Sequence, residues 1–234
     1  MAACFFRRIS DSTRGDLIGG FVISLFLFAG TGVRTVGLIY TSAGKQAFLA
    51  ASYVIMVPFL IWGMRRIFPG WLVIAGSLVC FAGMGLLTSD VSDPLNIGDV
   101  LSTVSALFIA GHIISIGYYA KNGDPFVLVF VQFFVTSILS FCTAMIFHGA
   151  PAFQGTQGLF EIAYITLIGT FACFLLQNVA LKYTSTTHAS IILGLQSVFG
   201  VLGGIFFLGE VFTFKMIVGC CLIFSAIVLV ELKK

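Results

Sequence analysis

Among the polar side chains inside otherwise apolar stretches of this sequence, five are the first candidates for chemistry. A polar group surrounded by hydrocarbon is costly unless it binds a partner, so its presence there calls for an explanation. The five are Arg34, Tyr53, Gln177, Gln196 and His112. The first four could line a site for a small molecule. His112 could carry a proton, because imidazole titrates near neutral pH.

Each of these residues also has a structural explanation. Arg34 either binds an anion or extends its long stem to the headgroups from about six residues inside its helix. Gln177 and Gln196 either contact a substrate or hydrogen-bond a neighbouring helix. His112 is either a proton-coupling group or a neutral, hydrogen-bonded residue of the bundle. The residue types alone leave these alternatives open.

Tyr53 stands near the middle of its apolar stretch, five residues before Pro58. A proline loosens a membrane helix, so this neighbourhood is a candidate binding site; the alternative is a tyrosine of the interfacial belt. Gln132 is assigned a hydrogen bond between helices. Asp99 and Glu161 stand near helix starts, where the positive end of the helix dipole stabilises them, and they are assigned structural roles.

The elements that must position these residues are membrane helices. The composition is 59% hydrophobic and 9% charged, against roughly 25% charged in a soluble domain. This excludes a soluble globular protein and a disordered chain. Apolar runs long enough to cross a bilayer occur at residues 17–40, 44–64, 70–88, 98–121, 125–148, 158–182, 187–208 and 213–232. The predicted fold is therefore all-α, a polytopic membrane bundle of eight transmembrane helices.

Basic residues between the runs predict the orientation. One side of the membrane receives nine of them: Arg7, Arg8, Arg14, Arg65, Arg66, Lys121, Lys182, Lys233 and Lys234. The other side receives Lys45 and Lys215. Because the more basic loops stay in the cytoplasm, both termini of this multi-pass membrane protein are expected to be cytoplasmic. The net charge of +3 is thus a topology signal and does not indicate nucleic-acid binding.

The sequence carries no pattern typical of an enzyme. It lacks HExxH and GxSxG, and Gly44-Lys45 lacks the glycine that a P-loop places five residues earlier. The three histidines are scattered and have no carboxylate next to them, so no metal site is predicted. The six cysteines are mostly inside helices and are interpreted as small apolar residues. We expect neither catalysis nor a cofactor.

An internal match indicates a duplication. At an offset of 143 residues LIYTS (38–42) aligns with LKYTS (181–185), and the same register pairs Gly76 with Gly219. The register relates runs that lie five helices apart, so the two copies cross the membrane in opposite directions, as in many secondary transporters. The expected organisation is inverted five-helix repeats. Residues 1–97 form a first repeat that is truncated at its N-terminus to three helices, and 98–234 form a complete second repeat.

Several motifs follow one another in a definite order: YTSAG at 40–44, Gly-Asp at 98–99 and YTS at 183–185. Together they resemble the EamA type of the drug/metabolite transporter superfamily. The resemblance implies a ten-helix fold of two inverted repeats, export or exchange of small metabolites across a bacterial inner membrane, and no bound cofactor. The chain departs from the family in two ways: Gln196-Ser197 stands where the family often has Glu-Pro, and the family's first two helices have no counterpart.

The function expected from these features is secondary transport of small metabolites or drugs by alternating access, in the direction of export. Its partners would be the lipid bilayer and a small-molecule substrate. The alternative is a non-transporting truncated product, or a half-component whose partner supplies the missing helices. Helices left uncovered in this way would favour a homo-oligomer or such a helix-supplying partner.

Overall fold

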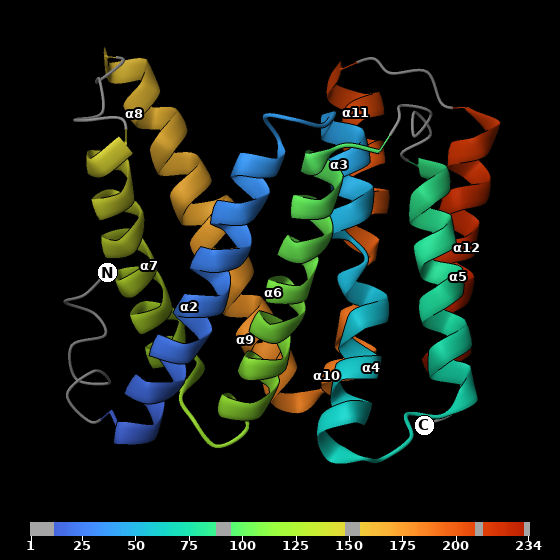
Figure 1. Cartoon of the computed structure of the whole chain (residues 1–234), viewed down its shortest axis with the longest axis horizontal. Helices are drawn as coiled ribbons and strands as arrows, with labels where there is room; N and C mark the ends of the chain where they lie inside the picture. Colours follow the sequence, from blue (N-terminus) through green and yellow to red (C-terminus); the bar gives the residue numbers. More distant parts are fainter. Residues whose placement is uncertain (1–11, 88–94, 148–154, 209–212, 232–234) are drawn as a thin grey trace. The chain divides into compact units, whose positions relative to one another are not determined.

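A computed structural model describes residues 12–87, 95–147, 155–208 and 213–231 of the chain (Figure 1). All regular elements in these ranges are helices. They are α2 (Arg14–Gly37), α3 (Ala43–Ala50), α4 (Tyr53–Arg65), α5 (Trp71–Leu87), α6 (Ile97–Tyr119), α7 (Pro125–Phe147), α8 (Gly155–Tyr164), η1 (Ile165–Ala172), α9 (Cys173–Tyr183), α10 (Thr186–Ile192), α11 (Leu195–Leu208) and α12 (Phe214–Glu231).

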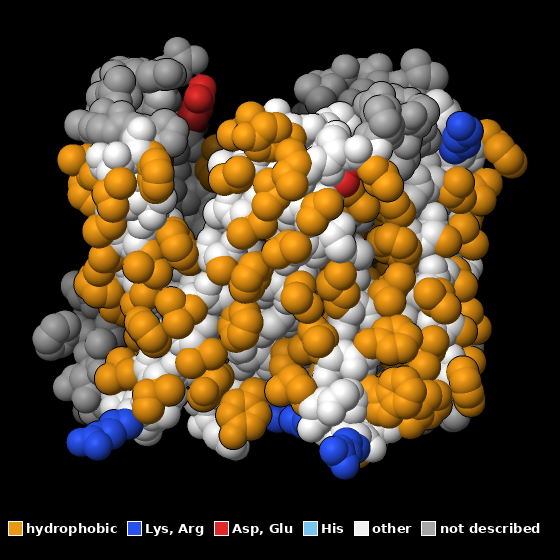
Figure 2. Space-filling view, viewed as in Figure 1, with side chains coloured by type: hydrophobic (Ala, Val, Ile, Leu, Met, Phe, Trp, Pro, Cys, Tyr) orange, Lys and Arg blue, Asp and Glu red, His pale blue; other side chains and the backbone are white. Residues whose placement is uncertain are grey.

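Membrane-crossing helices follow the predicted runs closely. Seven helical stretches in the described ranges are long and apolar enough to cross a bilayer, and α5, with 17 residues, is a shorter eighth. Apolar side chains cover much of the face shown in Figure 2. The described ranges as a whole expose large apolar residues such as Phe141, Leu176 and Phe206. Lipid, not water, suits such a surface. The prediction of an all-α membrane bundle is confirmed.

Packing divides the chain into two units. Unit 1 comprises Met1–Phe28 and Ser115–Thr184, and unit 2 comprises Ala29–Ile114 and Ser185–Lys234. This division reflects which helices touch, whereas the predicted repeats (1–97 and 98–234) reflect which segments correspond in sequence. The repeat boundaries therefore stay a prediction. Arg7, Arg8, Lys233 and Lys234, which were used to predict the orientation, lie outside the described residues.

In unit 2 the helices α5 and α12 lie side by side (Figure 1). Small residues bring their backbones together: a Cβ atom on Gly83 would lie 2.8 Å from the Gly219 carbonyl oxygen, and one on Gly76 would lie 3.3 Å from that of Ala226. Close approach at small residues is how membrane helices gain packing energy. The two contacts are also equivalent under the predicted repeat. At the 143-residue offset Gly76 corresponds to Gly219 and Gly83 to Ala226, so the contact of Gly83 with Gly219 matches the contact of Gly76 with Ala226.

Unit 1 is built around α7. The rings of Phe133 on α7 and Phe174 on α9 meet edge to face at 5.3 Å. On α2, a Cβ atom on Gly20 would lie 2.6 Å from that of Val131, so this glycine lets the two helices approach. Asp16 in the first turn of α2 accepts a hydrogen bond from the Asp124 backbone N–H at 3.1 Å. These contacts hold α7 against α2 and α9 within unit 1.

One crossing is not a uniform α-helix. Between α8 and α9 the chain forms η1, a π-helix of eight residues. The Cys173 thiol donates to the Ile168 carbonyl at 3.4 Å. The two residues are five positions apart, which is the spacing of hydrogen bonds in a π-helix. π-Helical turns are rare and occur frequently at functional sites.

Candidate functional site

Two membrane helices of unit 2 are interrupted in the same way. α3 ends at Ala50 and α4 begins at Tyr53, while α10 ends at Ile192 and α11 begins at Leu195. The starts of α3 and α10 are 143 residues apart, and each is capped by a serine: Ser42 accepts the Lys45 N–H and Ser185 the His188 N–H, both at 3.3 Å. Serine is among the best residues for this position, since its side chain binds an otherwise unpaired N–H.

Backbone hydrogen bonds change character at both interruptions. The Ser52 N–H bonds the Leu49 carbonyl at 3.1 Å, and the Gly194 N–H bonds the Ile191 carbonyl at 2.9 Å. Each of these bonds joins residues three positions apart, as in a 3₁₀-helix, whereas the bonds of an α-helix join residues four positions apart. Interrupted helices in corresponding halves of a chain are the usual framework of a substrate site in secondary transporters.

Tyr53 and Gln196 connect the two interruptions. The Gln196 side-chain amide donates to the Tyr53 hydroxyl at 3.1 Å, across 143 residues of sequence. Tyr53 is buried, whereas Gln196 is exposed. The sequence singled out both as candidates, and the structure brings these two together.

α5 supports the second interruption from one side. A Cβ atom on Gly194 would lie 2.6 Å from the Met84 methyl carbon and 2.7 Å from the Cys80 sulfur, so only glycine fits there. The Cys80 thiol also lies 3.9 Å from the Ile191 carbonyl, at the edge of the last turn of α10. The site is thus backed by a helix that is itself packed on α12.

The other predicted residues lie elsewhere. Arg34 is in the last turn of α2 with its side chain exposed, and its backbone carbonyl accepts the Gln46 amide at 2.5 Å. His112 is buried within α6 in unit 2. Gln177 is half-buried in α9 and belongs to unit 1. None of the three hydrogen-bonds Tyr53 or Gln196 in the part of the chain described, so their assignment to a common site stays a prediction.

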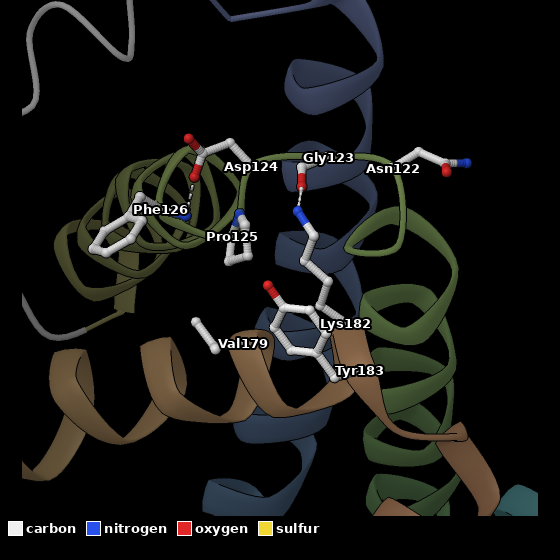
Figure 3. A pocket seen from close by; sticks show the side chains of 8 residues that line it. All are labelled: Asn122, Gly123, Asp124, Pro125, Phe126, Val179, Lys182 and Tyr183. Carbon is white, nitrogen blue, oxygen red and sulfur yellow. Dashed lines mark hydrogen bonds between the residues drawn. The ribbon is translucent and has the colours of Figure 1, made fainter.

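A pocket of about 480 Å³ opens in unit 1 at the ends of α7 and α9. Lys182 extends from α9 and donates to the Gly123 carbonyl at 2.9 Å (Figure 3). The Asp124 carboxylate accepts a hydrogen bond from the Phe126 N–H at 2.9 Å. The pocket is lined by a loop and helix ends, and none of the five predicted residues lines it. We therefore place the candidate site at the interruptions and not in this pocket.

A model of the EamA-like transporter family matches residues 96–232. The chain belongs to this family. The EamA-like chain is 31% identical over 226 residues to an "Uncharacterized transporter" of Archaeoglobus fulgidus, covering 93% of this chain and 70% of that protein. A second protein of the same description and organism is 32% identical over 134 residues, which is 57% of this chain and 45% of that protein.

Structural comparison agrees on the fold. A solved crystal structure matches this EamA-like chain with a TM-score of 0.81 at 11% identity, over 99% of this chain and 82% of the other. At that identity the likeness concerns the fold alone. The resemblance drawn from the YTSAG, Gly-Asp and YTS motifs is confirmed, and the chain is a multi-pass membrane transporter.

One part of this EamA-like protein was missed by sequence reasoning. Lys45 was counted only as a loop charge, and Asp99 only as a helix-start residue. In the structure the Lys45 ammonium lies 2.6 Å from the Asp99 carboxylate, and the two side chains are 2% and 5% exposed. A signal was present: Lys45 is a charge inside the stretch from Ala43 to Arg65 that crosses the membrane. Such a charge needs a partner.

Proposed function

We propose that this EamA-like protein is a secondary transporter that moves small metabolites or drugs out of the cell by alternating access. The two inverted repeats would rock about a site at the interrupted helices, with Tyr53 and Gln196 as substrate contacts. Arg34 and Gln177 would be further substrate-binding residues, and His112 would be the candidate for proton coupling.

The observation that carries this proposal is the hydrogen bond between Tyr53 and Gln196. These residues occupy matching positions in two helices that are interrupted at nearly the same place, and each comes from a different predicted repeat. A contact between equivalent residues is what a two-fold relation between the repeats would place on its axis. A neutral hydroxyl–amide pair at such a point can exchange its mutual bond for bonds to a substrate that carries both a donor and an acceptor.

The test is transport by purified protein in liposomes, with and without Tyr53→Phe and Gln196→Leu. A lost hydrogen bond of about 0.5–1.5 kcal/mol lowers kcat/KM roughly two- to tenfold. If the two residues act together, the double variant should lose about as much as either single one. Tyr118→Phe is the matched control, because Tyr118 is exposed on α6. Equal effects of Tyr53→Phe and Tyr118→Phe would contradict the assignment.

The alternative of a component that needs a partner rests on a different observation. The most apolar stretch within Gly158–Tyr183 has no buried residue in this chain. Lipid can cover such a surface, and so can helices from a partner or a second copy. Native mass spectrometry of the protein from its own membrane would separate these cases. A co-purifying membrane subunit, combined with inactivity of the chain alone, would favour the half-component.

A further inference from the structure

The Lys45–Asp99 ion pair joins the starts of two helices in unit 2. Lys45 is in the first turn of α3, and Asp99 is in the first turn of α6. The ammonium–carboxylate distance is 2.6 Å, and both side chains are almost wholly buried. Nothing in the proposed substrate site uses this pair.

Asp99 is held in place by a full set of hydrogen bonds. One carboxylate oxygen accepts the Thr41 hydroxyl at 2.9 Å, and the other accepts the Asn96 backbone N–H at 3.0 Å as well as Lys45. The Asn96 side chain in turn accepts the Asp99 N–H at 3.1 Å, which completes a reciprocal helix cap. The carboxylate is thus held in its orientation by Thr41 and Asn96 as well as by Lys45.

The chain around the ion pair is tightly closed. A Cβ atom on Gly98 would lie 2.7 Å from the Gly37 carbonyl oxygen and 2.9 Å from the Thr41 nitrogen, so the end of α2 and the start of α6 touch through their backbones. The Gln46 amide adds a bond to the Arg34 carbonyl. Nothing larger than a glycine hydrogen fits at this crossing.

A buried ion pair is a poor choice for stability alone, because desolvating the charges offsets most of their attraction. It suits a contact that must form and break, since water solvates both charges again on separation. We propose that Lys45 and Asp99 are positioning residues that close one end of the transport path, and that the transport cycle separates them when that end opens. This inference rests on the proposed alternating access.

The experiment measures how accessible this end is to water and needs no substrate. Ser102 lies one turn beyond Asp99 on α6, is fully buried, and donates to the Gly98 carbonyl at 2.7 Å. In nanodiscs, a charged thiol reagent is added to Ser102→Cys protein, and peptide mass spectrometry follows modification at that position separately from the native cysteines. The same measurement is made with Lys45→Gln and with Asp99→Asn.

Each single variant leaves one buried charge without its partner, which is strongly destabilising for the closed arrangement. We expect modification of the cysteine to accelerate about tenfold or more in both singles. Lys121→Gln, which removes an exposed lysine, is the matched control and should leave the rate unchanged.

A second variant keeps the inference testable if the single variants do not fold. Lys45→Met/Asp99→Leu leaves no unpaired charge, and its apolar contact favours the closed end. It should label no faster than the parent and should slow transport at least about fivefold, because opening now exposes apolar surface. Unchanged labelling in folded single variants, or full transport by the apolar pair, would overturn the inference. Absence of transport for every substrate, with labelling as expected, would count against the proposed function and not against the closing contact.

Discussion

Arg34 is the most conspicuous single residue of the chain, since a guanidinium inside an apolar run costs about 2.5–3.5 kcal/mol at the helix centre on insertion scales. Its side chain is exposed in the last turn of α2. If it attracts anions, Arg34→Gln should lower transport of anionic substrates severalfold and leave neutral ones within about twofold. Counterflow with a panel of both kinds measures this. Arg65→Gln, at the exposed end of α4, is the control; identical behaviour of both variants would make Arg34 a residue that only reaches the headgroups.

The residues of the candidate site could be found from the sequence because they are polar and stand in apolar runs. Tyr53 and Gln196 were identified in this way, but their mutual hydrogen bond was not. Lys45 was missed, because a lysine near the end of a run is also typical of a loop. A linear pattern shows how deep a side chain lies, but it does not show which helix it faces. The sequence signal at Lys45 shows that this charge needs a partner, but Asp99 lies 54 residues further along the chain, and only the packing of the helices brings the two together.

At the scale of elements, the crossing of α5 and α12 allows a sharp test. Gly83→Ala would place a methyl group 2.8 Å from the Gly219 carbonyl and 2.9 Å from the Ile223 side chain, so the helices must separate. Overpacking of this kind costs about 1–3 kcal/mol. We expect a Tm in detergent several degrees lower. Gly63→Ala, where nothing lies within 4 Å of the added carbon, is the matched control. It should leave the Tm unchanged or raise it, since alanine favours a helix by about 1 kcal/mol over glycine.

Helix positions were predicted well, because apolar run length reports directly on a membrane crossing. The interruptions were not. Pro58 was expected to loosen the helix around Tyr53, but it lies inside α4, and the interruption is at Ala51–Ser52. A proline cannot donate a hydrogen bond to the residue four positions earlier. In this chain the helix nevertheless continues through Pro58 and is interrupted before Tyr53. The π-helical turns of η1 likewise have no signature in an apolar sequence.

At the scale of the whole molecule, an even number of crossings predicts that both termini lie on one side of the membrane. The distribution of lysine and arginine predicts that this side is the cytoplasm. Alkaline phosphatase fused after Lys234 should therefore be inactive and green fluorescent protein at the same place fluorescent, whereas phosphatase fused after Asp93 should be active. The reverse pattern would invert the orientation.

Fold class and family were accessible from composition, run lengths and the order of three motifs. The two packing units were not, because two of their three boundaries fall within α2 and α6, where the sequence shows no break. Arg14 to Gly37 is one apolar helix by pattern, although its two ends belong to different units. Which helices touch is a property of side-chain shape, and a hydropathy pattern does not contain it.

The wide turns of η1 also determine how the side chains of α8 are rotated about the helix axis relative to those of α9. A π-helix closes each turn one residue later than an α-helix, so the side chains of α8 are rotated about the axis relative to a straight continuation of α9. Loss of a single codon between Ile165 and Ala172 would let this stretch close as an α-helix. Because the π-helical stretch accommodates one extra residue, its loss would leave α8 and α9 with nearly the facing that they have now. Length variation of one residue in homologous proteins at this point would therefore shorten the crossing with little change of facing.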